Sequence, residues 1–253
     1  MMRFLRWILR LVSFGRLGKE PKSVVPLLVY PVLPDSFAFN QVQLVDKTDE
    51  SGQDSYYTSE PWLVDIQKVA QAVTYAEGWL TQALGTPIRW EPVRTIQSQS
   101  SIAQWRSGKI YLIENEVKTL GLPWNKNHVY LAFVRGMGGY AGGINYQNGN
   151  AGFAMVGDIC LEAICQFSQP TAGSELLQPP VWGSNAYSLA GQSGAFIHEA
   201  LHGLGLPHPD RWPAGEQPGM DETLMGNWWN MPTFPGTRGL TQREIDKVLE
   251  WLS

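Results

Sequence analysis

Residues 198–208 read H-E-A-L-H-G-L-G-L-P-H and contain three of the four histidines in the chain. His198 and His202 are four residues apart, so on a helix their imidazoles lie one turn apart and face one ion, with Glu199 beside them. Gly205 follows the last expected turn, where a glycine can take a positive φ and let the chain reverse. The reversal would return His208 to the same ion. The stretch therefore predicts a three-imidazole metal site at the end of a helix.

Three imidazoles form the ligand set of a catalytic zinc ion rather than a structural one. A catalytic zinc site has three protein ligands and leaves its fourth position for water. A structural zinc would need a fourth protein ligand, and Asp210 is the one close candidate. A carboxylate beside the water, here Glu199, takes its proton as the water attacks a carbonyl. We therefore expect Zn²⁺ as the cofactor and Glu199 as the general base.

The pattern H-E-x-x-H-x-x-G-x-x-H resembles the extended zinc motif of the metzincin metallopeptidases, and the H-P ending is similar to their serralysin-like branch. The resemblance implies that His198, His202 and His208 bind zinc and that Glu199 is the general base. It also implies an endopeptidase that hydrolyses peptide or protein substrates with metal-activated water. Two other functions remain open: a membrane-associated binding module with a vestigial metal site, and a metallohydrolase acting on an amide outside peptides.

The same resemblance implies a methionine beneath the three histidines, in the segment called the Met-turn. Three methionines follow the motif: Met220, Met225 and Met231. We choose Met225, in T-L-M-G-N, because its small and apolar neighbours are most similar to the S-x-M-x-Y turn of the clan. Asn227 stands where astacin-like and serralysin-like enzymes have a tyrosine. A tyrosine that assists the oxyanion is therefore not expected, and the branch of the clan stays open.

The rest of the chain predicts a loop-rich α+β domain, since only 17% of its residues are charged while Gly (26), Pro (17) and Trp (11) are plentiful. Helices are predicted at 62–84, 190–204 and 241–252, strands at 23–34, 88–96, 110–114, 129–134 and 151–156, and loops at 41–61 and 136–150. Prolines place the first strand near a sheet edge, and Thr241 with Glu244 forms a capping box for the last helix. By resemblance the fold is metzincin-like. A mixed twisted sheet with long helices forms the N-terminal lobe, and the Met-turn and terminal helix form a small C-terminal lobe.

An edge strand aligns the substrate in that fold, and the resemblance assigns this role to residues 151–156. Ala151, Gly152, Phe153 and Ala154 would then pair with an extended peptide by adding it to the sheet as a strand. The fourth histidine, His128, lies in a turn before a strand and is expected to be structural.

Residues 1–20 form a basic amphipathic segment ahead of the catalytic domain, which we place at residues 21–253. Arg3, Arg6 and Arg10 would lie on one stripe of a helix whose remaining surface is apolar. A signal peptide has an uninterrupted apolar core, and Arg10 interrupts this one. The pattern favours membrane-surface association through residues 3–16, or organelle targeting, over a helix packed on the domain. Localisation stays open, with a secreted or membrane-associated protein favoured.

Charge and cysteine content say little more about partners. The net charge of −4 gives no reason to expect a nucleic acid, and we expect a monomer. Cys160 and Cys165 lie close together in the sequence, so they would either close a small disulfide loop or remain as two buried thiols. Both alternatives are open.

Overall fold

A computed structural model describes residues 22–32, 42–48, 54–59, 66–106, 110–137, 141–144, 151–158, 160–161, 164–165, 189–220, 222–226 and 239–253. The basic segment 1–20 lies outside the described residues, as do Asn227 and Met231. Within these ranges, no helix is both long enough and apolar enough to cross a membrane.

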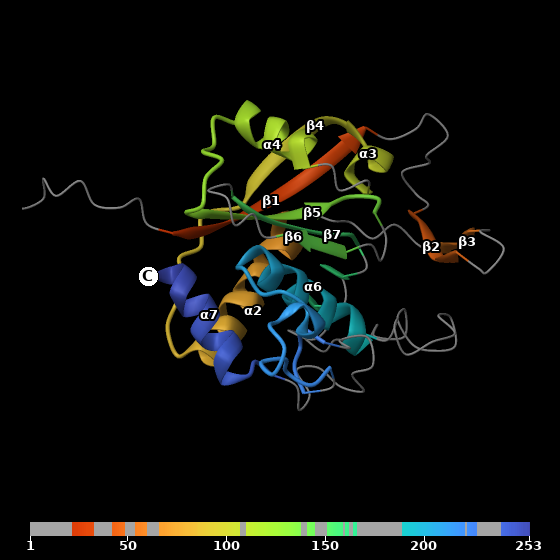
Figure 1. The fold of residues 1–253 in the computed structure, drawn as a ribbon. Coiled ribbons are helices and arrows are strands. Elements are labelled where there is room, and N and C mark those ends of the chain that lie inside the picture. The colour runs from red at the N-terminus through yellow and green to blue at the C-terminus, as the bar shows by residue number, and fades with distance from the viewer. Residues whose placement is uncertain are drawn as a thin grey trace, which may run out of the picture.

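The centre of the protein is a five-stranded sheet with the order β4-β1-β5-β7-β6 (Figure 1). Its strands are β1 (Ser23–Val32), β4 (Arg94–Ser101), β5 (His128–Val134), β6 (Ala141–Ile144) and β7 (Gly152–Val156). The first four in the sheet order run parallel, and β6 is antiparallel to β7. The protein is therefore α+β with a mixed, mostly parallel sheet.

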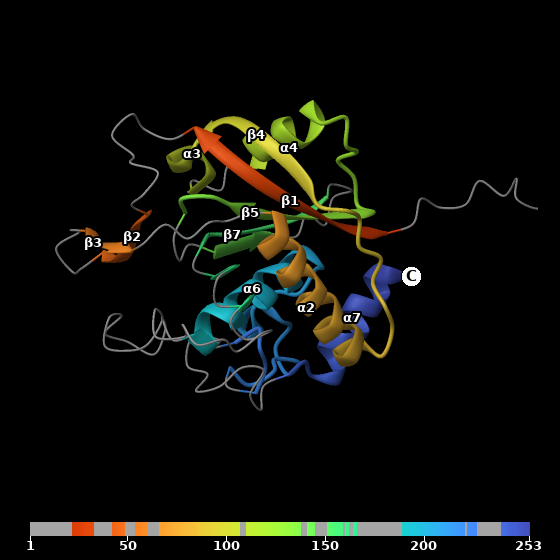
Figure 2. The same ribbon diagram turned by 180° about the vertical axis from the view of Figure 1, so that it is seen from behind.

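Helices cover both faces of the sheet, which Figures 1 and 2 show from opposite sides. One face carries α2 (Ile66–Leu84), α6 (Leu189–Gly203) and α7 (Gln242–Leu252). The other face carries the shorter α3 (Ile102–Arg106) and α4 (Ile110–Thr119). A 3-10 helix, η4 (Pro209–Arg211), follows α6. The described elements thus form three layers with the sheet in the middle.

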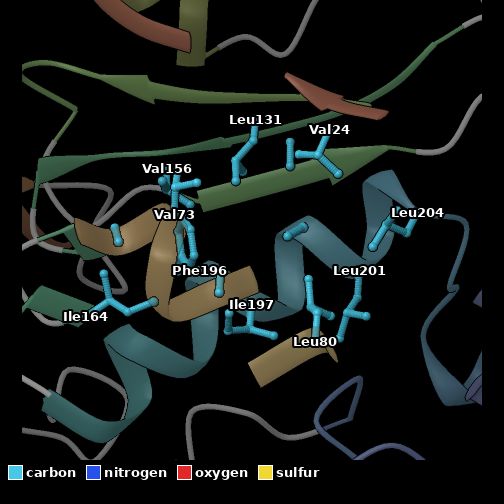
Figure 3. Close-up of a cluster of buried hydrophobic side chains, with 14 of the residues drawn as sticks. Val24, Val73, Leu80, Leu131, Val156, Ile164, Phe196, Ile197, Leu201 and Leu204 are labelled. Atoms are coloured by element: carbon cyan, nitrogen blue, oxygen red, sulfur yellow. The ribbon is translucent and has the colours of Figure 1, made fainter. Parts of the chain in front are cut away.

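Each face of the sheet has its own hydrophobic core, because side chains alternate along a strand. In β5, Val129, Leu131 and Phe133 enter the core shared with α2 and α6. Tyr130 and Ala132 enter the core shared with α3 and α4. Figure 3 shows the first of these cores, where side chains of the sheet, α2 and α6 meet. All of β5 is buried, as expected for a parallel strand covered on both faces.

The terminal helix packs on the same core as α2 and does not form a separate lobe. Val248 of α7, together with Leu224 and Met225 before it, is fully buried in that core. The helix begins with the predicted capping box. The Glu244 N–H donates to the Thr241 side chain, and the Thr241 N–H donates to the Glu244 carboxylate at 2.8 Å.

Strand β1 lies further inside the sheet than its prolines predicted, because it pairs with β4 on one side and β5 on the other. The strand contains Pro26 and Pro31, and the nitrogen of each faces a position where no regular strand pairing is present. The Val24 N–H and carbonyl bond to Arg89 and Glu91, in the segment that leads into β4. The nitrogen of Pro26, two residues later, faces the same side, just before the regular pairing with β4 begins at Leu27. Pro31 follows Val29, the last residue paired with β5. Prolines at these positions interrupt no ladder hydrogen bond.

Several other predicted segments also differ in the structure. Within the loop predicted at 41–61, the described residues form two antiparallel strands, β2 (Val42–Thr48) and β3 (Asp54–Ser59). Residues 110–114 are not a strand but the start of α4, where Ile113, Glu116 and Val117 are buried at helical spacing. The strand predicted at 88–96 begins with an isolated bridge and becomes regular only in β4.

The strand predicted at 151–156 is present as β7, but it is not an edge strand. It is paired with β5 on one side and β6 on the other. Ala151, Gly152, Phe153 and Ala154 therefore have no free edge for a substrate, and their assignment as the substrate strand is wrong. The outer position belongs to β6, which comes from the glycine-rich stretch predicted as a loop.

Candidate metal centre

Helix α6 positions the first two histidines by burying its other sides. Phe196, Ile197 and Leu201 pack in the core against the sheet and α2 (Figure 3). His198 is 1% exposed, and His202, one turn later, is partly buried. Their ring centroids lie 4.6 Å apart. The packing of the helix thus brings two imidazoles together at its buried C-terminal half.

The chain reverses after α6 through a Schellman motif. The Leu206 N–H donates to the Leu201 carbonyl, and the Gly205 N–H donates to the His202 carbonyl, both at 3.0 Å. Gly205 has a φ of 107°, a left-handed conformation that residues with a side chain rarely adopt. The glycine at this position therefore allows the turn that returns His208 to the helix.

The three imidazoles form one cluster. The His208 ring centroid lies 5.1 Å from that of His198 and 4.6 Å from that of His202. One ring nitrogen from each residue lies within 4.8 Å of the other two. The His198 ring stands at 87° to the other rings, which are stacked at 6° to each other. Three imidazole nitrogens at this spacing make a group that could hold a metal ion.

Main-chain carbonyls determine which ring nitrogen two of the histidines leave for a metal. Nδ1 of His198 lies 2.8 Å from the Leu224 oxygen, and Nδ1 of His202 lies 2.6 Å from the Leu206 oxygen. A carbonyl oxygen only accepts, so each Nδ1 carries the proton and donates it, and each Nε2 keeps its lone pair. Partners of this kind orient histidines that bind metals.

Burial keeps the imidazoles in the neutral form that metal binding requires. It lowers the pKa of His198 to about 3 and the pKa of His202 to about 4. The pKa of His208 is also lowered, first by burial and then by the positive charge of Arg211. At neutral pH the cluster can therefore accept a cation without first releasing protons. The donor set fits Zn²⁺, which binds three imidazoles in many sites.

Glu199 lies buried beside these residues, 7% exposed. Burial raises the pKa of its carboxyl to about 8. Strand β6 passes close by, since a Cβ on Gly143 would lie 2.6 Å from the Glu199 carbonyl oxygen, 3.0 Å from Oε2 and 2.8 Å from the His202 Cβ. Only glycine allows this approach. The sequence reasoning missed Gly143, because repeated glycines indicate a loop as readily as a close contact of two backbones.

Met225 is fully buried in the segment that contacts the first histidine. The preceding residue, Leu224, supplies the carbonyl that accepts from His198. The next residue, Gly226, lies directly against the main chain of Met220, because a Cβ on Gly226 would lie 1.9 Å from the Met220 carbonyl oxygen. Met225 is thus one residue away from the carbonyl that contacts the His198 ring. Its assignment as the Met-turn methionine stays a prediction.

His128 and the two cysteines are not part of the cluster. Nδ1 of His128 lies 3.0 Å from Oδ1 of Asn125, and its ring stacks on Tyr130. Cys160 and Cys165 are buried and are not joined by a disulfide in the structure, which agrees with the alternative of two buried thiols. Burial raises the pKa of the Cys160 thiol. This keeps the thiol protonated and unreactive.

No family model matches this sequence, and a search of curated proteins finds no match. Among solved structures, a chain of a chaperone–substrate complex is 15% identical with a TM-score of 0.38, and the match covers 91% of this chain and 34% of that chain. This chain therefore spans about a third of that protein's length. A zinc-dependent peptidase from Methanocorpusculum labreanum is 9% identical with a TM-score of 0.29, and the match covers 90% of this chain and 100% of that chain. Neither similarity is close enough to assign a family.

Proposed function

We propose that this protein is a zinc-dependent endopeptidase of the metzincin type. The proposal rests on the arrangement at the end of α6, where three neutral imidazoles cluster and the buried carboxylate of Glu199 adjoins the first of them. Three imidazoles leave one position of a tetrahedral zinc ion for water, and hydrolysis needs a general base beside that position. A site that only stores a metal has no need of the base.

In the proposed reaction the chain itself supplies the acid–base chemistry. When bound, zinc would polarise the scissile carbonyl and lower the pKa of a water molecule. Glu199 would take the proton of the attacking water and give it to the amine as the peptide bond breaks. Burial raises the pKa of this carboxyl towards neutrality in the metal-free protein. A carboxyl of this kind can both take up a proton and return it.

Strand β6 is the proposed docking edge for the substrate, in place of β7. Among the described strands it ends the sheet and pairs only with β7. No other described strand pairs with its far edge, so an extended peptide could bond there by adding a strand. Gly143 of β6 lies against Glu199, so a peptide on this edge would run past the base.

Cleavage mapping on a peptide library tests the proposal. Wild type, Glu199→Gln and Glu77→Gln are compared with and without a chelator, and bound zinc is measured by elemental analysis. Glu77 is exposed on α2, so its variant is the same chemical change away from the site. We expect wild type and Glu77→Gln to bind stoichiometric zinc and to cleave internal peptide bonds. Glu199→Gln should keep the zinc and lose about 10²- to 10⁴-fold in rate.

Other outcomes would contradict the proposal in distinct ways. Equal cleavage by Glu199→Gln would exclude that residue as the base. Zinc binding with hydrolysis of small amides but of no peptide would indicate a metallohydrolase outside peptides. Zinc binding without any hydrolysis, together with association of residues 3–16 with anionic vesicles, would indicate the binding module.

A further inference from the structure

The carboxylate of Glu244 in α7 makes more bonds than helix capping requires. Glu244 is 0% exposed. It accepts the Thr241 N–H at 2.8 Å, which belongs to the capping box, and it also accepts the Thr241 hydroxyl at 2.9 Å. Both of its oxygens also lie 2.7 Å from the Thr223 hydroxyl oxygen. A glutamine can fill the same place in a capping box without burying a charge. The bond to Thr223, a residue outside the helix and its cap, is therefore not explained by capping.

Thr223 connects this carboxylate to the segment beside the metal centre. Its hydroxyl oxygen accepts the Met225 N–H at 3.1 Å. Because a carboxylate cannot donate, the single hydroxyl proton of Thr223 goes to Glu244 and an oxygen lone pair faces Met225. Between these two residues, the Leu224 N–H donates to the Gly239 carbonyl at 3.0 Å. The position of Leu224 is thus fixed by the hydrogen bonds of the Thr223 hydroxyl, of the Met225 N–H and of its own N–H.

The Leu224 carbonyl is the group that accepts the Nδ1–H of His198, at 2.8 Å. Thr223, Leu224 and Met225 are all 0% exposed, so water does not replace these bonds. A continuous hydrogen-bonded path therefore runs from Glu244 through Thr223 and the main chain of Leu224 to the His198 ring.

We propose that Glu244 and Thr223 are positioning residues for the first zinc ligand. They hold the Leu224 carbonyl where it sets both the tautomer and the orientation of the His198 ring. Groups that orient a ligand in this way strongly affect metal affinity. The inference rests on the proposed function, because it requires His198 to bind the metal. It assigns α7 a part in the metal centre in addition to its packing on the core.

Three variants separate positioning from stability. Thr223→Val keeps the side-chain shape and removes the hydroxyl, and Thr223→Ser keeps the hydroxyl. Thr241→Val removes the other hydroxyl bonded to Glu244, at the start of the helix. The full chain is titrated with Zn²⁺ against a competing chelator, loaded with Co²⁺ for its absorption spectrum, and unfolded in urea without metal.

We expect Thr223→Val to weaken zinc binding by about 10- to 100-fold and to shift the Co²⁺ absorption bands. Thr223→Ser should restore both properties. Thr241→Val should lower the urea midpoint and leave the zinc affinity and the Co²⁺ spectrum unchanged. A purely structural role would instead lower the urea midpoint in both valine variants and change zinc affinity in neither.

Equal zinc affinity in wild type and Thr223→Val would overturn the inference and leave the proposed function standing. Failure of wild type to bind zinc would contradict the proposed function itself. If Thr223→Val does not fold, Glu244→Gln decides. It keeps the cap, but its amide can donate to the Thr223 oxygen and reverse that hydrogen bond. Weaker zinc binding with an unchanged urea midpoint would support the inference, and unchanged zinc binding would overturn it.

Discussion

Glu199→Gln should stabilise the metal-free protein at alkaline pH, although it removes the proposed base. Glu199 is 7% exposed, and burial raises the pKa of its carboxyl from the ordinary 4.5 to about 8. The unfolded chain ionises the same carboxyl near 4.5. Since the folded pKa is the higher one, the folded state holds the proton more tightly. The wild type therefore loses stability as the pH rises from 4.5 through 8. A glutamine has no such ionisation.

The size of the effect follows from the two pKa values. At a pH well above both pKa values, the shift from 4.5 to about 8 lowers the free energy of unfolding of the wild type by roughly 5 kcal/mol, at about 1.4 kcal/mol per pKa unit. The variant should be more stable than wild type by about 2 kcal/mol near pH 6 and by about 4 kcal/mol near pH 8, and by almost nothing near pH 4. Histidine titration is common to both proteins and cancels in the difference.

Urea unfolding with a chelator present measures this difference, followed by the fluorescence of the chain's tryptophans at intervals between about pH 5 and pH 8. Glu77→Gln, an exposed change of the same kind, is the control and should show no such dependence on pH. A Glu199→Gln difference that stays flat over this range would refute the reasoning. So would a wild type that is the more stable protein near pH 8.

Three further substitutions test other parts of the structure. Gly143→Ala places a Cβ 2.6 Å from a main-chain oxygen of α6, so we expect weaker zinc binding and loss of peptide cleavage. Full activity of this variant would contradict the close approach of β6 to α6. Gly205→Ala forces a φ of 107° on a residue with a side chain, and urea unfolding should show a loss of roughly 1–3 kcal/mol. Ser98→Ala removes a buried hydroxyl that donates to Glu116 at 2.6 Å and accepts from the Trp105 indole N–H at 2.9 Å. It should lower the free energy of unfolding by roughly 1–3 kcal/mol and leave chelator-competition zinc affinity unchanged, because this cluster lies on the opposite face of the sheet.

The parts of the structure that the sequence predicted well depend on local contacts. His198 and His202 meet because they are one helical turn apart, and Gly205 allows the turn that follows. The capping box of α7 depends on Thr241 and Glu244, three residues apart. In each case the partners are close in the chain, so spacing alone predicts the geometry.

The parts that were missed depend on contacts between distant segments or on ambiguous patterns. The sequences of β7 and β6 do not indicate which of the two lies at the edge of the sheet, so the edge strand was assigned to the wrong segment. Residues 110–114 form a short apolar run, which indicates a strand as readily as a buried helix. The contact of Thr223 with Glu244 joins two polar residues far apart in sequence, and neither residue alone signals it.

The metal centre should reach its final geometry only after α7 has folded against the rest of the described structure. Among the described elements α7 leaves the ribosome last, and Glu244 reaches Thr223 only when this helix folds onto α2. Before that moment the histidines of α6 have emerged, but the carbonyl that orients His198 lacks its support. Because domains fold as units, a chain whose α7 has not yet folded would load zinc poorly.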